Sequence, residues 1–247
     1  LGSVAETMIT NNYADHIYTL SKGISWITFQ NECAAIRIDD QLCKQGKGIT
    51  LYSSFKQNLK GDKIYTVFED SEGDEWILTN KGISIIGKKQ VDSDFPFQYI
   101  KEADGIIYLV SQSDKLASYN FKTRQFKFIE IPYHVSMINE VKKFDSNTLL
   151  LATDNGLIIY KIKEKEFQLI DIRTSTQPSN VVQSVYQDHY KELWIFPQTT
   201  GVIRYNPSTK EMQHLFTPAD EVIRYERKNK NVIFEDRQHT LWVLPPE

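Results

Sequence analysis

Cysteine, histidine and long apolar runs are scarce in this chain. Among its 247 residues there are two cysteines and five histidines, and they show none of the spacing of a zinc site. No stretch comes near the roughly 18 uninterrupted apolar residues of a membrane-spanning helix, and the periodicity of amphipathic helices is nearly absent. These absences exclude a zinc module and a helical membrane protein. They leave open whether Cys33 and Cys43 pair across a hairpin.

The chain also lacks a large excess of charge of either sign. A formal net charge of -3 gives no broad basic field, so we expect no nucleic-acid partner. The locally basic runs YKIKEKEF and RYERKNKN are interpreted as solvated strand or loop faces. With 40% hydrophobic and 25% charged residues, the composition is that of an ordinary globular protein with a full core.

What the sequence does contain is an internal repeat, marked by its four tryptophans. Aligned on this position, Trp26, Trp76, Trp194 and Trp242 are joined by two weaker copies with Tyr108 and Leu150 in the same place. Successive positions differ by 50, 32, 42, 44 and 48 residues. This spacing centres on the roughly 40–50 residues of one propeller blade.

Each copy has the same internal order of strands and turns. An alternating apolar stretch such as IYTVFED is followed by a polar turn, and a second strand such as EWILT or LWIFP carries the aromatic residue. A turn containing glycine (NKG, DNG or TTG) supplies a position that tolerates positive φ. Two further short strands close the unit. Four short antiparallel strands in tandem are typical of a propeller blade.

The sequence therefore predicts an all-β fold, a single partial β-propeller of four-stranded antiparallel blades over residues 1–247. About five and a half blades are expected in this chain, as part of a seven-bladed ring. The predicted blades cover approximately residues 14–60, 61–95, 96–134, 135–177, 178–218 and 219–247. The last copy, VIFEDRQHTLWVLPPE, stops after two strands, so we expect the parent polypeptide to continue with a glycine turn and another strand.

The repeated tryptophan is expected to fill the wedge between neighbouring twisted sheets, where an aromatic side chain buries roughly 150–250 Å². The aspartate six residues before it (Asp70, Asp188 and Asp236) is expected to cap the hairpin through the backbone. The turn DSEGDE is similar to part of a calcium loop but lacks the full ligand spacing and the distal glutamate. No metal site and no cofactor are predicted.

The copies resemble the two-component regulator propeller repeat, in which an apolar strand, an acidic turn, a Leu-Trp-Ile-Gly-Thr strand and a glycine turn follow one another. FEDSEGDEWILTNKGIS matches this pattern almost position by position, and YQDHYKELWIFPQTTGVIRYN matches in all but the Gly-Thr. FEDRQHTLWV carries the front half, whereas LLLATDNGLIIY carries the back half without the tryptophan. The resemblance covers about residues 16–247.

This resemblance implies the periplasmic sensor region of a Bacteroides-type hybrid two-component histidine kinase. It implies an oligosaccharide ligand, signalling across the inner membrane, and a further propeller and a β-sandwich of the same kinase as partners. A homodimer is left open. No kinase motif is visible in the sequence, so the chain itself is not expected to be an enzyme.

In a propeller, ligands usually meet the loops between second and third strands and between successive blades. Sugars require flat aromatic rings and planar amide or guanidinium groups at such a face. Six residues lie in these predicted loops, have side chains suited to binding sugars, and are predicted to bind the ligand: Tyr133, His134, Arg173, Gln112, Asn155 and Gln198.

Two other functions compete with the sensor. Lyases that share a propeller of similar blade length, acting on a polysaccharide or a small cyclic ester, use a histidine and a glutamate with a divalent metal. Here only His134 falls on the predicted ligand face, while His189 and His239 fall in hairpin turns at the opposite end. A protein-interaction propeller of the WD type would carry Gly-His and Trp-Asp dipeptides, which are missing.

Overall fold

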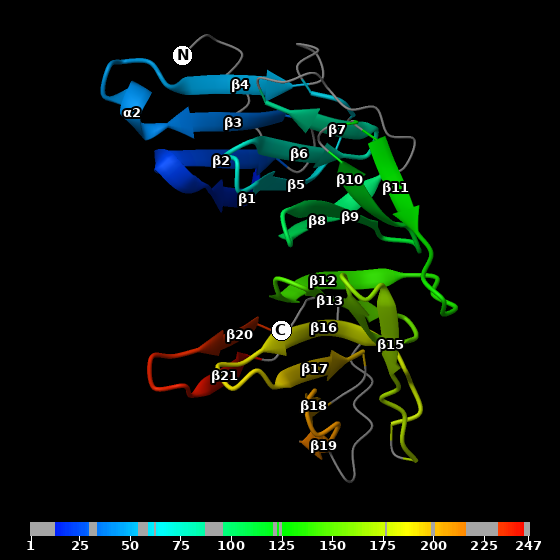
Figure 1. Ribbon diagram of the computed structural model, residues 1–247. Helices are drawn as coiled ribbons and strands as arrows, with labels where there is room; N and C mark the ends of the chain where they lie inside the picture. Colours follow the sequence, from blue (N-terminus) through cyan, green and yellow to red (C-terminus); the bar gives the residue numbers. More distant parts are fainter. Residues whose placement is uncertain are drawn as a thin grey trace. The chain divides into compact units, whose positions relative to one another are not determined.

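The computed structural model is built almost entirely from antiparallel β-sheets, which confirms the predicted all-β propeller fold (Figure 1). It describes residues 13–29, 34–53, 59–61, 63–86, 96–120, 123, 125–175, 177–198, 201–215 and 232–244. The chain divides into two compact units, Leu1–Ser111 with Ala117–Lys127 and Gln112–Leu116 with Phe128–Glu247.

The first unit holds three sheets in which strands adjacent in sequence are adjacent in space. A short 3-10 turn, η1 (Ser21–Gly23), and a short helix, α2 (Asp40–Cys43), connect strands of the first sheet. Leu116 and the residues Phe128 and Ile129 of the third sheet are assigned to the second unit. The strands of the three sheets are β1 (Ala14–Thr19), β2 (Ile24–Phe29), β3 (Ala34–Asp39) and β4 (Ile49–Ser53); β5 (Ile64–Glu69), β6 (Glu75–Thr79) and β7 (Gly82–Ile85); β8 (Phe97–Ala103), β9 (Ile106–Ser111), β10 (Leu116–Asn120) and β11 (Gln125–Ile129).

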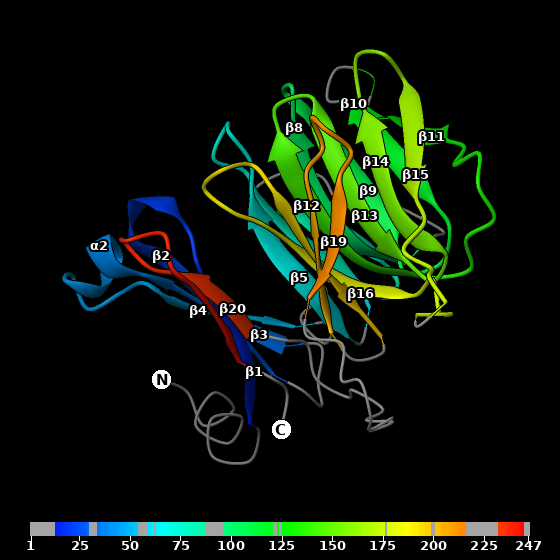
Figure 2. The same ribbon diagram turned by 90° about the horizontal axis from the view of Figure 1, so that it is seen from below.

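The second unit continues the same up-and-down order. Figure 2 shows the strands of its first sheet side by side. Among the described residues the last sheet has two strands. The strands are β12 (Ile138–Asp145), β13 (Thr148–Thr153), β14 (Gly156–Lys161) and β15 (Glu166–Ile170); β16 (Val182–Gln187), β17 (Leu193–Pro197), β18 (Val202–Tyr205) and β19 (Met212–Leu215); β20 (Val232–Glu235) and β21 (Leu241–Leu244).

The repeated tryptophans occupy equivalent positions in these sheets. Each lies on the second strand, directly opposite an aromatic residue of the first strand. We call the face of a sheet that carries this pair its leading face and the opposite face its trailing face. The pairs are Tyr18 with Trp26, Phe68 with Trp76, Tyr186 with Trp194, and Phe234 with Trp242.

Within each unit the core lies between successive sheets, where the leading face of one packs on the trailing face of the next. Trp76 packs in one cluster with Phe97 and Ile100 of the following sheet. In the second unit, Leu150 of β13 packs in one cluster with Ile195 of β17. Second strands such as β13 (TLLLAT) are buried at every residue because both of their faces are covered. This explains why their sequences are continuous apolar runs.

The aspartate before the tryptophan caps the hairpin, as predicted. Asp70 Oδ1 accepts hydrogen bonds from the backbone N–H groups of Glu72 and Asp74, at 3.0 and 2.8 Å. Its other oxygen accepts from the indole Nε1 of Trp76 at 2.8 Å. Asp188 and Asp236 make the same indole bond within their own hairpins, at 2.8 and 2.9 Å. Each of these carboxylates therefore joins its turn to the tryptophan of the second strand.

The glycine after the second strand takes the positive φ that the sequence predicts. Gly82, Gly156 and Gly201 have φ values of 144°, 100° and 98°. At Gly156 the space is also closed, because a Cβ atom would lie 2.6 Å from the carbonyl oxygen of Ile170. A side chain at this position would therefore be strained by both the backbone and the neighbouring strand.

A carboxylate clasp links successive sheets at the hairpin end. The last glutamate of an innermost strand accepts the backbone N–H of the first turn residue of the sheet before it. In two of the three clasps a serine hydroxyl adds a second bond to the same carboxylate. The pairs are Ser21 with Glu69 at 2.6 Å, Ser71 with Glu102 at 2.7 Å, and His189 with Glu235 at 3.0 Å.

Candidate functional site

The loops at one end of the second unit bring together most of the residues predicted to bind a ligand. We call this end, where β13 passes into β14 and β17 into β18, the loop end. Asn155 lies in the first of these loops and Gln198 begins the second. Gln112 lies there too, because its carbonyl accepts the N–H of Ile138 at the start of β12, at 2.7 Å. Arg173 follows β15, whose last residue pairs with the beginning of β14.

Asn155 is held in place by its own side-chain hydrogen bonds. Its Nδ2 donates to the carbonyl oxygen of His134 at 3.0 Å. Its Oδ1 accepts from Nδ2 of Asn180 at 3.0 Å, and Asn180 in turn accepts the N–H of Gly156 at 2.7 Å. The side-chain amide of Asn155, predicted to contact a ligand, therefore holds the segments of His134 and Asn180 on either side of its loop. Sequence reasoning missed this role, and it missed Asn180 entirely.

Four of the residues predicted to bind a ligand are exposed at the loop end: Gln112, His134, Arg173 and Gln198. Arg173 Nε donates to both oxygens of Asp171, at 2.9 and 3.0 Å. This bond lowers the pKa of the Asp171 carboxyl and raises the pKa of the Arg173 guanidinium. The pair thus offers a fixed donor fork beside a charged acceptor, an arrangement suited to neighbouring hydroxyl groups.

Tyr133 is placed differently from the other predicted residues. Its hydroxyl donates to the carbonyl oxygen of Phe167 on the outer strand β15, at 3.1 Å, and its side chain is half-buried. The ring of Phe167 stacks on Tyr160, with centroids 4.4 Å apart. Tyr133 is therefore anchored along the outer strand, which sequence position alone does not indicate.

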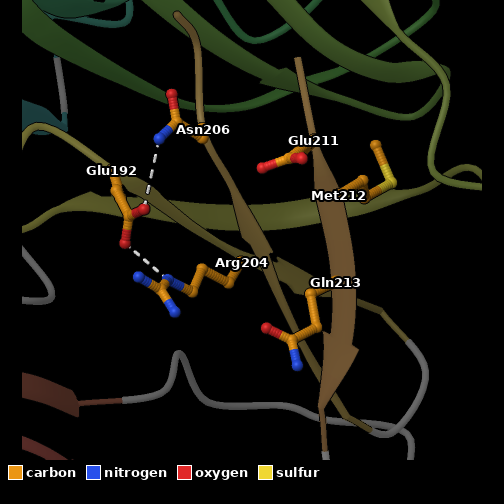
Figure 3. Close-up of a pocket in the computed structure, with 6 residues that line it drawn as sticks. All are labelled: Glu192, Arg204, Asn206, Glu211, Met212 and Gln213. Atoms are coloured by element: carbon orange, nitrogen blue, oxygen red, sulfur yellow. Dashed lines mark hydrogen bonds and ion pairs between the residues drawn. The ribbon is translucent and has the colours of Figure 1, made fainter. Parts of the chain in front are cut away.

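A polar hollow of about 420 Å³ lies on the outer strands of the β16–β19 sheet (Figure 3). Arg204 Nε donates to Glu192, and Nδ2 of Asn206 donates to Oε1 of the same glutamate at 3.3 Å. The hydrogen bond from Arg204 to Glu192 raises the pKa of the Arg204 guanidinium. The lining residues are Glu192, Arg204, Asn206, Glu211, Met212 and Gln213.

The hollow lies on the leading face of its sheet, because Arg204 pairs with both Trp194 and Gln213 across the strands. In the first sheet the same place beside the tryptophan is taken by Arg37, which pairs with Trp26. None of the residues predicted from the sequence lies in this hollow. The signal that could have found it is the arginine that recurs on the third strand.

A second hollow, of about 380 Å³, lies at the hairpin end of the same unit. The rings of His189 and His239 stack there with centroids 3.7 Å apart and an interplanar angle of 16°. Glu235 accepts the backbone N–H of His189 and lies 3.1 Å from Nδ1 of His239. Both histidines lie in hairpin turns, at the end opposite the loops, as the sequence predicts.

Within the part of the chain that the structure describes, no three histidine, cysteine, aspartate or glutamate side chains gather in a way that could hold a metal ion. Of the described helices, none has the length and apolar character needed to cross a membrane. Cys43 is a free cysteine, while Cys33 lies outside the described residues.

The repeated antiparallel sheets, four of which carry an indole at the same place on the second strand, define a β-propeller fold. No family model matches the chain. The chain is similar to histidine kinase P4 of Formosa agariphila, with 22% identity over 235 residues. This covers 90% of the chain and 15% of that much longer relative.

Solved structures show the same fold. The extracellular domain of a hybrid two-component system from B. thetaiotaomicron aligns with a TM-score of 0.64 and 15% identity, over 95% of this chain and 32% of that one. Virginiamycin B lyase from Staphylococcus aureus aligns with a TM-score of 0.64 and 16% identity, over 93% of this chain and 83% of that one. The resemblance to propeller regions of two-component sensors, expected from the repeat, is confirmed.

Proposed function

We propose that the chain is part of the extracytoplasmic ligand-sensing propeller region of a hybrid two-component sensor histidine kinase, and that it recognises an oligosaccharide. The likeness to histidine kinase P4 over nearly the whole chain is the observation that carries the proposal. The likeness to extracellular domains of hybrid two-component systems supports the same function and an extracytoplasmic location. The rest of the kinase is then the partner that receives the signal.

The loop end is the proposed binding face. Its polar groups are planar and come from separate loops, so that one extended ligand would contact several of them at once. The Arg173–Asp171 pair supplies fixed donors and acceptors, and His134 supplies an exposed imidazole ring. Asn155 fixes the loops through its side-chain amide, Gln112 holds the start of β12 through its backbone carbonyl and offers an exposed side chain, and Tyr133 packs the segment before His134 onto β15.

A ligand held between loops of neighbouring sheets would favour one arrangement of those sheets. Asn180 connects the loop of β13–β14 with the segment that enters β16, so its hydrogen bonds span the two sheets. A ligand that binds more tightly when this connection is fixed shifts the equilibrium of the whole sensor region between two states. Transfer of phosphate itself is left to the parts of the kinase outside this chain.

A thermal-shift screen against oligosaccharides released from polysaccharides tests the proposal. Ligand at 100 times its Kd stabilises the folded form by about 2.7 kcal/mol, which raises Tm by about 5–11 °C in a chain of this size. Gln198→Ala and His134→Ala should weaken binding. Gln238→Ala, which removes an exposed amide from a hairpin turn at the opposite end, is the matched control.

The competing lyase function is tested with the same protein. A streptogramin B antibiotic, the substrate named for one structural relative, is incubated with the chain and divalent metal, and ring opening is followed by mass spectrometry. Turnover without any oligosaccharide binding would contradict the sensor proposal. Oligosaccharide binding that the loop-end variants leave intact would remove the loop end as the site.

A further inference from the structure

The positive charges of the second unit are divided unevenly between its two ends. Most of its described lysines and arginines lie in or beside hairpin turns at the end opposite the loops, as in the turn that joins β14 to β15. In the segments that form the loop end, the structure describes two cations, Lys115 just before β10 and Arg173 after β15. The charge that a ligand meets at the described loop end therefore depends on what these two residues bind.

Arg173 is already bound to a carboxylate of its own loop. Its Nε donates to both oxygens of Asp171, at 2.9 and 3.0 Å, and its Nη2 donates to Oδ2 of the same side chain. Asp171 Oδ1 also accepts the backbone N–H of Arg173 at 3.0 Å. The residue between them, Ile172, donates its N–H to Oδ1 of the buried Asn180 at 2.9 Å. The backbone thus fixes this pair in place, which an ordinary exposed ion pair lacks.

Lys115 has a carboxylate partner in the same way, because its Nζ lies 3.1 Å from Oδ2 of Asp114. The hydrogen bonds from Lys115 and Arg173 lower the pKa of the Asp114 and Asp171 carboxyl groups. Both carboxylates therefore stay ionised at neutral pH and cancel the charges of their partners. A third carboxylate, Asp154, accepts the backbone N–H of Ser136 at 3.1 and 3.2 Å. The described loop-end segments thus hold more carboxylates than cations.

The other exposed side chains here are suited to hydroxyl groups. Gln112 and Gln198 carry amides, and His134 carries an imidazole ring, which is mostly uncharged above pH 7. A sugar hydroxyl both donates and accepts, so it can bond to an amide and to the outer edge of the ion pair at once. A ligand carboxylate or sulfate that approached Arg173 would also approach Asp171, and the like charges would repel each other.

We propose that the loop end selects an uncharged oligosaccharide and discriminates against chains that carry carboxylate or sulfate groups. This inference rests on the proposed function, because it names the class of oligosaccharide for the same site. Asp171 is then a specificity-determining residue, since it occupies the guanidinium that would otherwise hold an acidic sugar. Asp114 has the same effect on Lys115.

The test uses pairs of oligosaccharides that differ in charge alone: hexagalacturonate with its methyl ester, and C6-oxidised cellohexaose with cellohexaose itself. Binding is measured by isothermal titration calorimetry at pH 7.5, in 50 and 500 mM NaCl. The uncharged member of a pair should bind about tenfold or more tightly than the acidic member. Its Kd should change less than about twofold between the two salt concentrations, because no ligand charge is screened.

A gain of binding gives the sharper readout. Asp171→Asn leaves the Arg173 guanidinium without its charged partner, so the Kd of the acidic member should fall about fivefold in 50 mM NaCl. This gain should disappear in 500 mM NaCl. Asp114→Asn, which exposes Lys115 in the same way, should act in the same direction. Glu166→Gln removes one exposed carboxylate from the hairpin end of β15 and is the matched control for net charge.

The outcomes separate this inference from the proposed function. Salt-sensitive binding of the acidic member to the unaltered protein, as tight as that of its uncharged partner or tighter, would overturn the selection while leaving an oligosaccharide sensor in place. The same holds if Asp171→Asn and Asp114→Asn bind acidic chains no better than Glu166→Gln does. Binding of neither class, in these pairs and in the wider thermal-shift screen, would overturn the proposed function and this inference with it.

Discussion

Glu75→Gln, which exchanges one carboxylate oxygen for an amide NH2 group, should lower the stability of the first unit. The Glu75 carboxylate accepts from the indole Nε1 of Trp26 at 2.6 Å, and from Nη2 and Nε of Arg37 at 2.7 and 2.9 Å. All of these donors come from the preceding sheet. Glu75→Gln keeps the shape of the side chain but removes its charge and one of its two acceptor oxygens.

The expected loss follows from the burial of the pair. The side chains of Arg37 and Glu75 are 16% and 9% exposed, and breaking a buried ion pair by removing one partner costs about 3–5 kcal/mol. Asp39 stays 3.6 Å from Nη1 of Arg37 as a second partner. We therefore expect the low end, about 3 kcal/mol, or a fall in Tm of about 6–12 °C for a chain of this size.

Equilibrium urea denaturation, followed by tryptophan fluorescence, measures this loss. Glu72→Gln removes an exposed carboxylate from the adjacent turn and is the control. A double variant, Glu75→Gln with Arg37→Met, should lose less than the sum of the single variants, because no unpaired guanidinium is left behind. A Glu75→Gln variant that loses less than about 1 kcal/mol, or no more than the control, would refute the reasoning.

Three further changes test other parts of the structure. Gly156→Ala should lower the free energy of unfolding by about 2 kcal/mol or more, because φ is 100° and the added Cβ atom would meet a backbone oxygen. Gly105→Ala, where the added Cβ atom has open space around it, should lower it less. Similar Tm values for the two variants would be evidence against strain at Gly156. Asp188→Ala should cost about 1–3 kcal/mol by leaving the buried turn N–H and the indole unpaired, and an unchanged denaturation midpoint would contradict that role. The lowered pKa of Asp171, caused by its bond to Arg173, contributes stability above about pH 4 that is lost as the pH falls through the lowered value. The Tm difference between wild type and Asp171→Asn should therefore shrink on acidification, and a difference that stays constant down to strongly acidic pH would contradict this.

Features that depend on one hairpin were predictable from the sequence. The aspartate, the turn and the tryptophan six residues later lie within one strand–turn–strand unit, so spacing alone predicted the cap at Asp70. The positive φ at Gly156 was likewise a local requirement of its turn. The repeat predicted the equivalence of the four tryptophans, because the same order of strands implies the same register.

Features that depend on two sheets were not predictable in this way. Trp26 has Leu20 where the other three tryptophan copies have aspartate, and its indole is bound by Glu75 of the next sheet instead. The sequence does not show that Trp26 and Glu75 are neighbours, because their contact depends on which sheets face each other. The same holds for the loop end, where Asn155 was predicted to face a ligand but its amide also joins two loop segments.

The two faces of every sheet differ, and this gives the tandem array a direction. In the three described clasps the donor lies on one sheet and the carboxylate on the sheet that follows it within the same unit, and the indole of the donor sheet lies on its leading face. Duplication or loss of one whole repeat would thus again set a leading face against a trailing face, whereas inversion or a shift by half a repeat would bring together surfaces that do not match. Repeat number in such a protein can change by whole units while the chemistry of each junction stays the same.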